Sequence, residues 1–381
     1  MSGLRVLLTN NRLDARAGTP LYVRDVALGL LERGHTPVVY STKLGDFAEE
    51  MRKQTIPVVA DLCALATPPD VIHGQQSPET MTALLQFPDT PAVFFYHDNL
   101  DLKSVPPNFP RILRYVAVDH TCRDRLLCEH AIPEERVHVL LNSVDLKLFT
   151  PRAPLPPKPR RALLFSNYAS QHLAAVQAAC ARTNLTLDVI GADVGRPCAQ
   201  PEAVLGDYDI VFAKARCALE ALAVGAAVVL CDFRGVGPMV TSDELARLRA
   251  LNFGHRTLRA PIEPETIVRE IMRYDPQDAA KVARAIRATA GREQMVDEIV
   301  ALYREVLDEH AAAAPPDRAA ERRAVAAYLR QLTISMQVEQ ERFEQAVDNS
   351  TTMRLQRRLR RVPVLGTFAR ALARKLAGRA S

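Results

Sequence analysis

The sequence predicts an α/β protein with two doubly wound, Rossmann-like domains that face a cleft, followed by a C-terminal helical extension. Short apolar runs rich in β-branched residues alternate with helical patterns along most of the chain, as in a parallel sheet with crossover helices. A proline-rich segment at residues 151–160 interrupts this alternation once. At 381 residues, the chain is long enough for two domains with separate cores.

The first part of the chain predicts an N-terminal domain over residues 1–150. Helical periodicity runs from Thr19 to Arg33, and Gly34 is placed to end the helix. The first unit is therefore a strand, a loop that contains Gly18, a helix and a second strand. The expected strands are residues 4–9, 37–41, 70–74, 92–98, 115–119 and 137–141.

Residues 151–160, PRAPLPPKPR, are expected to link the two domains. Five prolines in ten residues fit neither a helix nor a central strand. The alternation then restarts and predicts a second domain over residues 161–310. Chains of this kind bind their ligand in the cleft, at the carboxyl ends of the strands. The expected strands are residues 161–167, 187–191, 209–213 and 227–232.

The region after the second domain differs in character. Residues 317–349 carry apolar residues at a four-three spacing, which predicts a long helix. This helix either packs on the body of the protein or forms the coiled coil of a homodimer.

The tail, residues 350–381, is strongly basic. Nine of the 49 Lys and Arg residues and none of the 44 acidic residues follow Asn349. A segment that mixes such cations with Leu, Val and Phe is typical of attachment to a membrane surface. We expect residues 351–381 to bind an anionic membrane; a solvated or partner-binding tail is the alternative.

Charge and cysteine usage narrow the class of protein. The first 349 residues are mildly acidic, which argues against a nucleic-acid-binding protein. Seven scattered cysteines without a CxxC pair indicate neither a disulfide framework nor a zinc site. The first residues do not follow the pattern of a secretory leader, and no apolar run approaches the roughly 18 residues of a spanning helix. We therefore expect a cytoplasmic protein, peripheral on the inner face of the cell membrane.

The stretch from Asp207 to Asp232 is the most informative for function. It predicts a strand that ends near Ala213, a loop with Lys214 and Arg216, and a helix from about Cys217 to Val224. A helix N-terminus with two cations beside it suits a diphosphate. Glu220, one turn into the helix, is placed to accept hydrogen bonds from a ribose diol. The alternative is that both cations are merely solvated.

This stretch resembles the nucleotide-sugar-dependent glycosyltransferases of the GT-B fold, especially those of family 4. Their motif is a Glu, seven residues, and a second Glu within an EALA.G.PVV segment. Glu220 matches the second Glu, which implies that it holds the donor ribose. Phe212 occupies the position of the first Glu, and Lys214 and Arg216 would then take over anion binding.

The resemblance covers roughly residues 4–307. Residues 17–41 are similar to the glycine loop and first helix of the family, which implies that Gly18 and Thr19 border the donor phosphates and the acceptor. The YHDN segment, 96–99, resembles the place of the active-site histidine, which implies catalytic roles for His97 and Asp98.

Three further segments bear on the donor site. Residues 232–240 are similar to a glycine-bearing loop, which implies donor contacts from Gly235, Val236 and Gly237. The segment 165–172 lacks the Arg and Lys that the family has there, so Ser166 and Asn167 would supply neutral hydrogen bonds. Residues 116–151 resemble the segment that ends in NGVD, in which we expect a structural turn role for Asn142 and Asp145.

The sequence thus predicts a bacterial glycosyltransferase of hexosyltransferase type. It would move a sugar from a nucleoside diphosphate sugar, its co-substrate, to an envelope or lipid-linked glycan. The resemblance implies retention of configuration and no bound metal or cofactor. Two alternatives stay open: a non-catalytic scaffold that binds a glycan or partner, and a nucleotide-sugar 2-epimerase.

Overall fold

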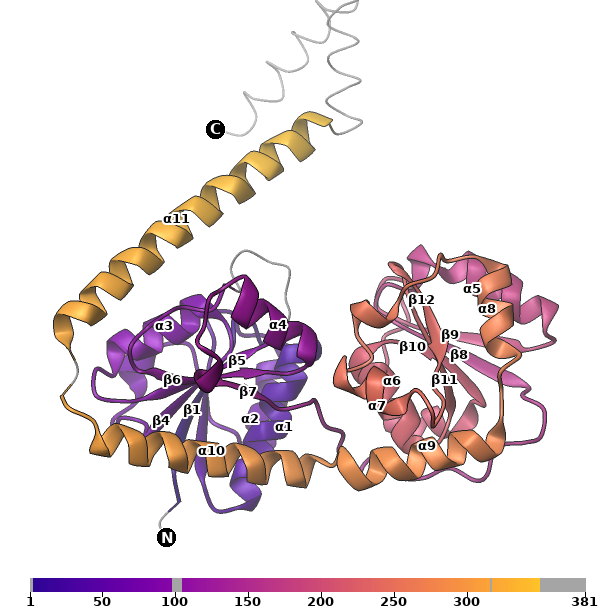
Figure 1. Cartoon of the computed structure of the whole chain (residues 1–381), viewed down its shortest axis with the longest axis horizontal. Coiled ribbons are helices and arrows are strands. Elements are labelled where there is room, and N and C mark those ends of the chain that lie inside the picture. The colour runs from indigo at the N-terminus through magenta and orange to yellow at the C-terminus, as the bar shows by residue number, and fades with distance from the viewer. Residues whose placement is uncertain (1–2, 98–104, 316, 350–381) are drawn as a thin grey trace, which may run out of the picture. The chain divides into compact units, whose positions relative to one another are not determined.

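The computed structural model describes residues 3–97, 105–315 and 317–349 (Figure 1). The chain divides into two compact units, Met1–Pro316 and Asp317–Ser381. The first unit contains two α/β lobes, and the second contains a long helix. The basic tail that is expected to bind a membrane, residues 350–381, lies outside the described residues.

The described strands of the first lobe form one parallel sheet. Their order is β3-β2-β1-β4-β5-β6-β7, so the direction of winding reverses between β1 and β4. Open α/β sheets bind ligands outside the carboxyl ends of the strands at such a reversal. The strands are β1 (Arg5–Thr9), β2 (Thr36–Tyr40), β3 (Val58–Val59), β4 (Val71–Gly74), β5 (Ala92–Tyr96), β6 (Ile112–Ala117) and β7 (Val137–Val139).

Helices connect these strands across both faces of the sheet. Helix α1 ends before Gly34, whose φ of 74° lies in the left-handed region that favours glycine, so the predicted helix end is confirmed. Helix α4 is capped by Asp119, which accepts a hydrogen bond from the Cys122 amide at 2.7 Å. The helices are α1 (Gly18–Glu32), α2 (Asp46–Lys53), α3 (Ser77–Gln86) and α4 (His120–Cys128).

The second lobe has a sheet of order β12-β11-β10-β8-β9, parallel except for β12. Successive side chains of its strands enter two cores: Val211 lies under α6 and α9, and Phe212 lies under α5 and α8. The strands are β8 (Arg161–Phe165), β9 (Thr186–Ile190), β10 (Ile210–Ala213), β11 (Ala227–Asp232) and β12 (Gly235–Met239). The helices are α5 (Leu173–Arg182), α6 (Ala215–Val224), α7 (Leu245–Ala250), α8 (Pro264–Ile271) and α9 (Pro276–Thr289).

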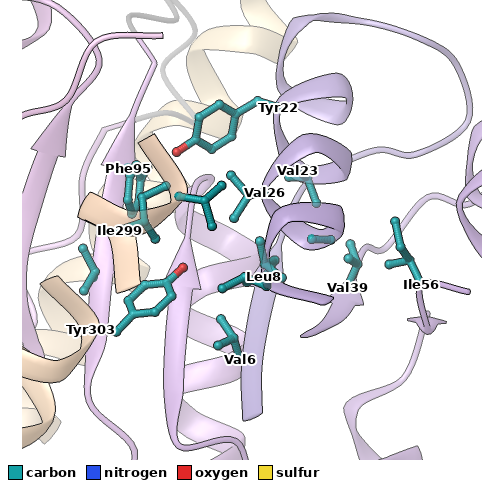
Figure 2. Close-up of a cluster of buried hydrophobic side chains, with 14 of the residues drawn as sticks. Val6, Leu8, Tyr22, Val23, Val26, Val39, Ile56, Phe95, Ile299 and Tyr303 are labelled. Carbon is teal, nitrogen blue, oxygen red and sulfur yellow. The ribbon is translucent and has the colours of Figure 1, made fainter. Parts of the chain in front are cut away.

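Helix α10 (Arg292–Ala312) returns to the first lobe. Its Ile299 and Tyr303 pack in the first hydrophobic core with Leu8 of β1 and Val26 of α1 (Figure 2). The expected second domain of 161–310 therefore ends earlier in this structure, because the apolar face of α10 is buried against α1 and β5.

The proline-rich segment 151–160 has neither helix nor strand, as expected, but it does not lie between the lobes. Val144 and Phe149 already pack in a core of the second lobe. The Arg152 amide then donates to the Val224 carbonyl at 2.9 Å. The chain therefore crosses between the lobes before the prolines, which run over the surface of the second lobe.

The two crossings between the lobes are hydrogen-bonded to each other. The Val144 amide donates to the Ala290 carbonyl at 2.9 Å, and the Arg292 amide donates to the Val144 carbonyl at 3.0 Å. The Arg292 guanidinium also pairs with the Asp145 carboxylate at 2.8 Å. The Asp145 carboxylate also accepts a hydrogen bond from the Lys147 amide at 2.9 Å, which confirms the structural turn role expected of Asp145.

The second unit contains the helix expected over residues 317–349. Helix α11 spans Arg318–Asn349. Within the described residues, no helix combines the length and the apolar character needed to cross a membrane. The predicted architecture of two Rossmann-like lobes and a helical extension is confirmed.

Candidate functional site

A cavity of about 250 Å³ lies between the two lobes of the first unit. The first lobe contributes residues from the start of α1, the end of β5 and the start of α4. The second lobe contributes the start of α6 and the turn that follows α7. The lining includes Gly18, Thr19, Tyr22, Asp25, His97, Asp119, Asn142, Ser143, Lys214, Arg216, Asn252 and His255.

Five residues predicted from the sequence meet in this cavity although they are far apart in the chain: Gly18, Thr19, His97, Lys214 and Arg216. Asp98, the second predicted catalytic residue, lies outside the described residues. The cavity is therefore the place where the sequence-based site and the structure agree best.

Two helix N-termini point their positive ends at the cavity. Helix α1 begins at Gly18 and helix α6 at Ala215, and neither start has a side-chain cap from the described residues. The Ala215 amide already donates to the Phe253 carbonyl at 3.0 Å, so the next amides of α6 are the ones that an anion could use. Uncapped first-turn amides and the helix dipole together favour an anion. The cavity is therefore suited to phosphate oxygens.

Arg216 does not stand free beside the helix, as the sequence analysis expected of a phosphate-binding cation. Its guanidinium pairs with Asp25 of α1 at 2.6 Å and with Glu220 at 2.7 Å. Burial alone would lower the pKa of Arg216, but the two carboxylates raise it above its ordinary value. Burial raises the pKa of Glu220, and Arg216 offsets part of that rise. Arg216 thus holds the two lobes together across the cavity.

Lys214 is paired as well. Its ammonium lies 2.6 Å from the buried Asp232 carboxylate and 3.0 Å from the His255 ring. Lys214 alone joins β10 to α6, so the helix begins at Ala215, earlier than predicted. Phe212 accordingly lies inside β10, fully buried, and not in a loop that faces the cleft.

His97 and Tyr22 form a second part of the lining. The two rings meet edge to face with centroids 4.7 Å apart. Neither His97 Nε2 nor the Tyr22 hydroxyl has a hydrogen-bond partner among the described residues. Burial lowers the pKa of His97 to about 4, so the ring is neutral near pH 7. A sugar hydroxyl could use both groups.

Six predicted donor-binding residues are not among those that line the cavity. Glu220 lies behind Arg216, and Ser166 and Asn167 follow β8. The expected glycine loop is strand β12, in which the Val236 amide donates to the Ala260 carbonyl at 2.9 Å. A Cβ at Gly237 would lie 2.8 Å from the Thr257 carbonyl oxygen, so close packing requires this glycine. The six residues are Ser166, Asn167, Glu220, Gly235, Val236 and Gly237.

A comparison with protein families places this site in context. Residues 17–148 match the model of Glycosyltransferase Family 4. This part of the chain is therefore similar to a glycosyltransferase family 4 domain. The match includes Gly18, Thr19 and His97, and it confirms the resemblance found in the sequence. A comparison with curated protein sequences gave no match.

Solved glycosyltransferase structures share the fold. A glycosyltransferase from Rickettsia africae ESF-5 matches with a TM-score of 0.60 and 14% identity, covering 81% of this chain and 99% of the other. Anabaena Alr3699/HepE in complex with UDP and glucose matches with a TM-score of 0.53 and 15% identity, covering 81% and 100%. The same Anabaena protein in complex with UDP matches with a TM-score of 0.56 and 15% identity, covering 80% of this chain and 100% of the other. These likenesses confirm the GT-B fold.

The sequence analysis missed several residues that line the cavity. Asp25 could have been found from the sequence, because it is an acidic residue within the otherwise apolar face of α1. Asn142 was expected to have a structural role, yet it lines the cavity together with Ser143. Asp119 and His255 stand in loops whose position no pattern indicated.

His97 gives the protein a pH-dependent stability. Its pKa in the folded state is about 4, whereas a free histidine titrates near 6.5. Between these values only the unfolded chain binds the proton, so stability falls as the pH drops through this range. When the pH falls from 7 to 5, we expect the free energy of unfolding of the His97→Gln variant to decrease by about 2 kcal/mol less than that of the wild type.

Urea unfolding at the two pH values measures this difference. Burial also lowers the pKa of His73, in the wild type and in the variant alike, so most of its contribution cancels in the comparison. Parallel losses in the wild type and the His97→Gln variant would show that His97 titrates normally in the folded protein.

Proposed function

We propose that the protein transfers a sugar from a nucleoside diphosphate sugar to a glycan or lipid-linked acceptor, with retention of configuration and without a bound metal. The observation that carries this proposal is the convergence of two helix N-termini, neither with a side-chain cap from the described residues, on one cavity, in a chain whose residues 17–148 resemble glycosyltransferase family 4. A leaving diphosphate carries negative charge that such N-termini stabilise.

The cations add to this stabilisation only in part. Lys214 and Arg216 already bind Asp232, Asp25 and Glu220, so their charge is largely compensated. In the proposed complex, the first-turn amides of α1, from Gly18, and those of α6 that follow Ala215 hold the diphosphate. Neutral His97 and Tyr22 then hold hydroxyls of the transferred sugar, and closure of the lobes excludes water.

Three residues of the second lobe that do not line the cavity would bind the rest of the donor. Ser166 and Asn167 would contact the nucleoside part of the donor, and Glu220 would act on the ribose or through Arg216. The tail, residues 351–381, would hold the enzyme at the cytoplasmic face of an anionic membrane. Salt-sensitive binding of the full chain to anionic liposomes is the signature of that attachment.

Thermal unfolding of the full chain with nucleotide sugars tests the donor site. We expect one of the UDP, GDP, dTDP or ADP sugars, at 100 times its dissociation constant, to add about 2.7 kcal/mol of stability. The free nucleoside is the control, because it lacks the diphosphate that the helix starts would bind, and it should add much less.

Two results would contradict the proposal that the protein is a transferase. Absence of stabilisation by every nucleotide sugar would favour the non-catalytic scaffold. An epimerised nucleotide sugar, formed from the donor without acceptor, would favour the 2-epimerase.

A further inference from the structure

Arg249, in helix α7, is a partly buried cation that pairs with neutral groups. Its guanidinium donates hydrogen bonds to the Asn252 side-chain oxygen at 2.8 Å and to the Asn142 carbonyl. Among the described residues, no carboxylate offsets its charge, and burial lowers the pKa of Arg249 to about 10. Removing a charge from water costs free energy that neutral partners return only in part. Arg249 is therefore better explained by the groups that it holds than by a contribution to folding.

The two groups that Arg249 holds come from separate parts of the chain, and both residues line the cavity between the lobes. Asn142 lies in the segment that leads out of the first lobe after β7, and Asn252 follows α7 in the second lobe. The Asn252 side-chain amide donates in turn to the Val118 carbonyl of the first lobe at 3.3 Å. A planar guanidinium holds two acceptors in fixed directions, which a lysine ammonium does not. Arg249 thus fixes a network that joins the lobes beside the cavity.

The turn that follows Arg249 has a strained backbone. Asn252 and Phe253 have φ angles of 52° and 54°, in the left-handed region that a bulky side chain such as phenylalanine rarely adopts. Ala215, the first residue of α6, is also left-handed, with a φ of 50°. Its amide donates to the Phe253 carbonyl at 3.0 Å, so the two strained segments are bonded to each other. Such conformations persist where the surrounding contacts enforce them, and they gather at ligand-binding sites.

A series of contacts leads from Arg249 to the start of α6. Arg249 holds the Asn252 side chain, and its carbonyl accepts from the Asn252 amide at 2.8 Å. The Phe253 ring is fully buried in a core of the second lobe, so the turn is anchored by this ring on one side and by Arg249 on the other. Because no side chain of the described residues caps α6, the bond from Ala215 to this turn supports the helix start.

We infer that Arg249 is a positioning residue for the donor diphosphate: it fixes the Asn252–Phe253 turn and, through this turn, the first-turn amides of α6. The inference rests on the proposed function and adds a residue that touches no ligand itself. It also gives a reason for the missing carboxylate. An acidic partner would compete with the Asn142 carbonyl and the Asn252 side chain for the guanidinium, and the turn would lose its support.

Isothermal titration calorimetry of full-chain variants tests this role, with inorganic pyrophosphate and a nucleoside diphosphate as ligands. We expect Arg249→Ala to weaken the binding of both ligands about tenfold, the affinity equivalent of one lost hydrogen bond to a charged group. The loss should be the same for both, because the residue acts on the phosphate-binding amides. The matched control is Arg247→Ala in the same helix, since Arg247 is 47% exposed and pairs with Glu244. This variant should bind both ligands as the wild type does.

Chemical rescue separates positioning from a general loss of structure. A second cavity, of about 170 Å³, is lined by Arg249 and Asn142, so a guanidinium ion can enter the space that Arg249→Ala leaves. We expect millimolar guanidinium chloride to restore the pyrophosphate affinity of Arg249→Ala, compared with the same concentration of sodium chloride. Arg249→Lys keeps the charge but not the planar fork, so it should bind pyrophosphate about as weakly as Arg249→Ala.

The outcomes distinguish the two proposals. Wild-type affinity in Arg249→Ala would overturn the positioning role and leave the proposed transferase activity untouched. A weakened affinity that guanidinium does not restore would overturn it as well, because a general loss of structure would then explain the defect. If Arg249→Ala does not fold, wild-type affinity in Arg249→Lys overturns the role, and a tenfold loss in this folded variant supports it. Failure of pyrophosphate and of every nucleotide to bind the wild type would overturn both proposals.

Discussion

The Arg216→Met variant is expected to unfold with a free energy about 3 kcal/mol below that of the wild type. The substitution leaves Glu220 and one oxygen of Asp25 buried without the guanidinium that both contact at 2.6–2.7 Å. An unpaired buried carboxylate is among the most damaging changes in a protein interior. Asp25 keeps Arg24, 2.8 Å away, so the loss stays near the lower end of the range for broken buried pairs.

Urea unfolding measures this loss, and an exposed arginine supplies the control. Arg247 pairs with Glu244 one helical turn away, and its side chain is 47% exposed. We expect Arg247→Met to change the free energy of unfolding by less than about 1 kcal/mol. Equal effects of the two substitutions would show that Asp25 and Arg216 are solvated and that the lobes do not meet through them.

The Phe212→Glu variant is expected to fail to fold, or to lose more than about 4 kcal/mol of stability. On the sequence alone, this change restores the first Glu of the family 4 motif and should strengthen donor binding. The structure places Phe212 inside β10, at 0% exposure, paired in register with Leu164 and Val229. No Lys or Arg in the described residues of the second lobe is buried, so a carboxylate there would lack a cation to pair with inside the core.

Solubility, circular dichroism and nucleotide-dependent stabilisation of the variant decide between these views. Phe212→Leu is the control, because it keeps an apolar side chain in the core and should cost only about 1–1.5 kcal/mol. A folded Phe212→Glu protein with tighter donor binding would show that this residue reaches the cleft.

The lobes were predictable because each strand and helix has a local signature. Gly34 ends α1, and the apolar runs match the strands of both sheets except β3, which was not predicted, and β12, which was expected as a glycine loop. The lobe on which α10 packs was not predictable, since the apolar face of a helix does not indicate which of two sheets it will pack against. The prolines at 151–160 were placed correctly as irregular chain, but their composition says nothing of where the lobes meet.

The candidate site was predictable in its cations but not in their partners. Lys214 and Arg216 stand at the start of α6, as the pattern indicated. Asp25 is distant from Arg216 in the sequence, and only the packing of the two lobes brings their charges together. The sequence analysis expected a loop between β10 and α6, but a single residue, Lys214, joins them. The match of Phe212 and Glu220 to the family motif fixes their spacing and gives no information about the length of this connection.

Helix α10 also decides how this protein can be cut and recombined. Because α10 follows the second lobe in the chain but completes the core of the first, the second lobe is an insertion between β7 and α10. A fragment that stops at residue 150 lacks Ile299 and Tyr303 and leaves its apolar sheet face bare. A chimera that exchanges the second lobe must therefore be joined at two points, near Val144 and near Gly291, where the chain segments already hydrogen-bond to each other.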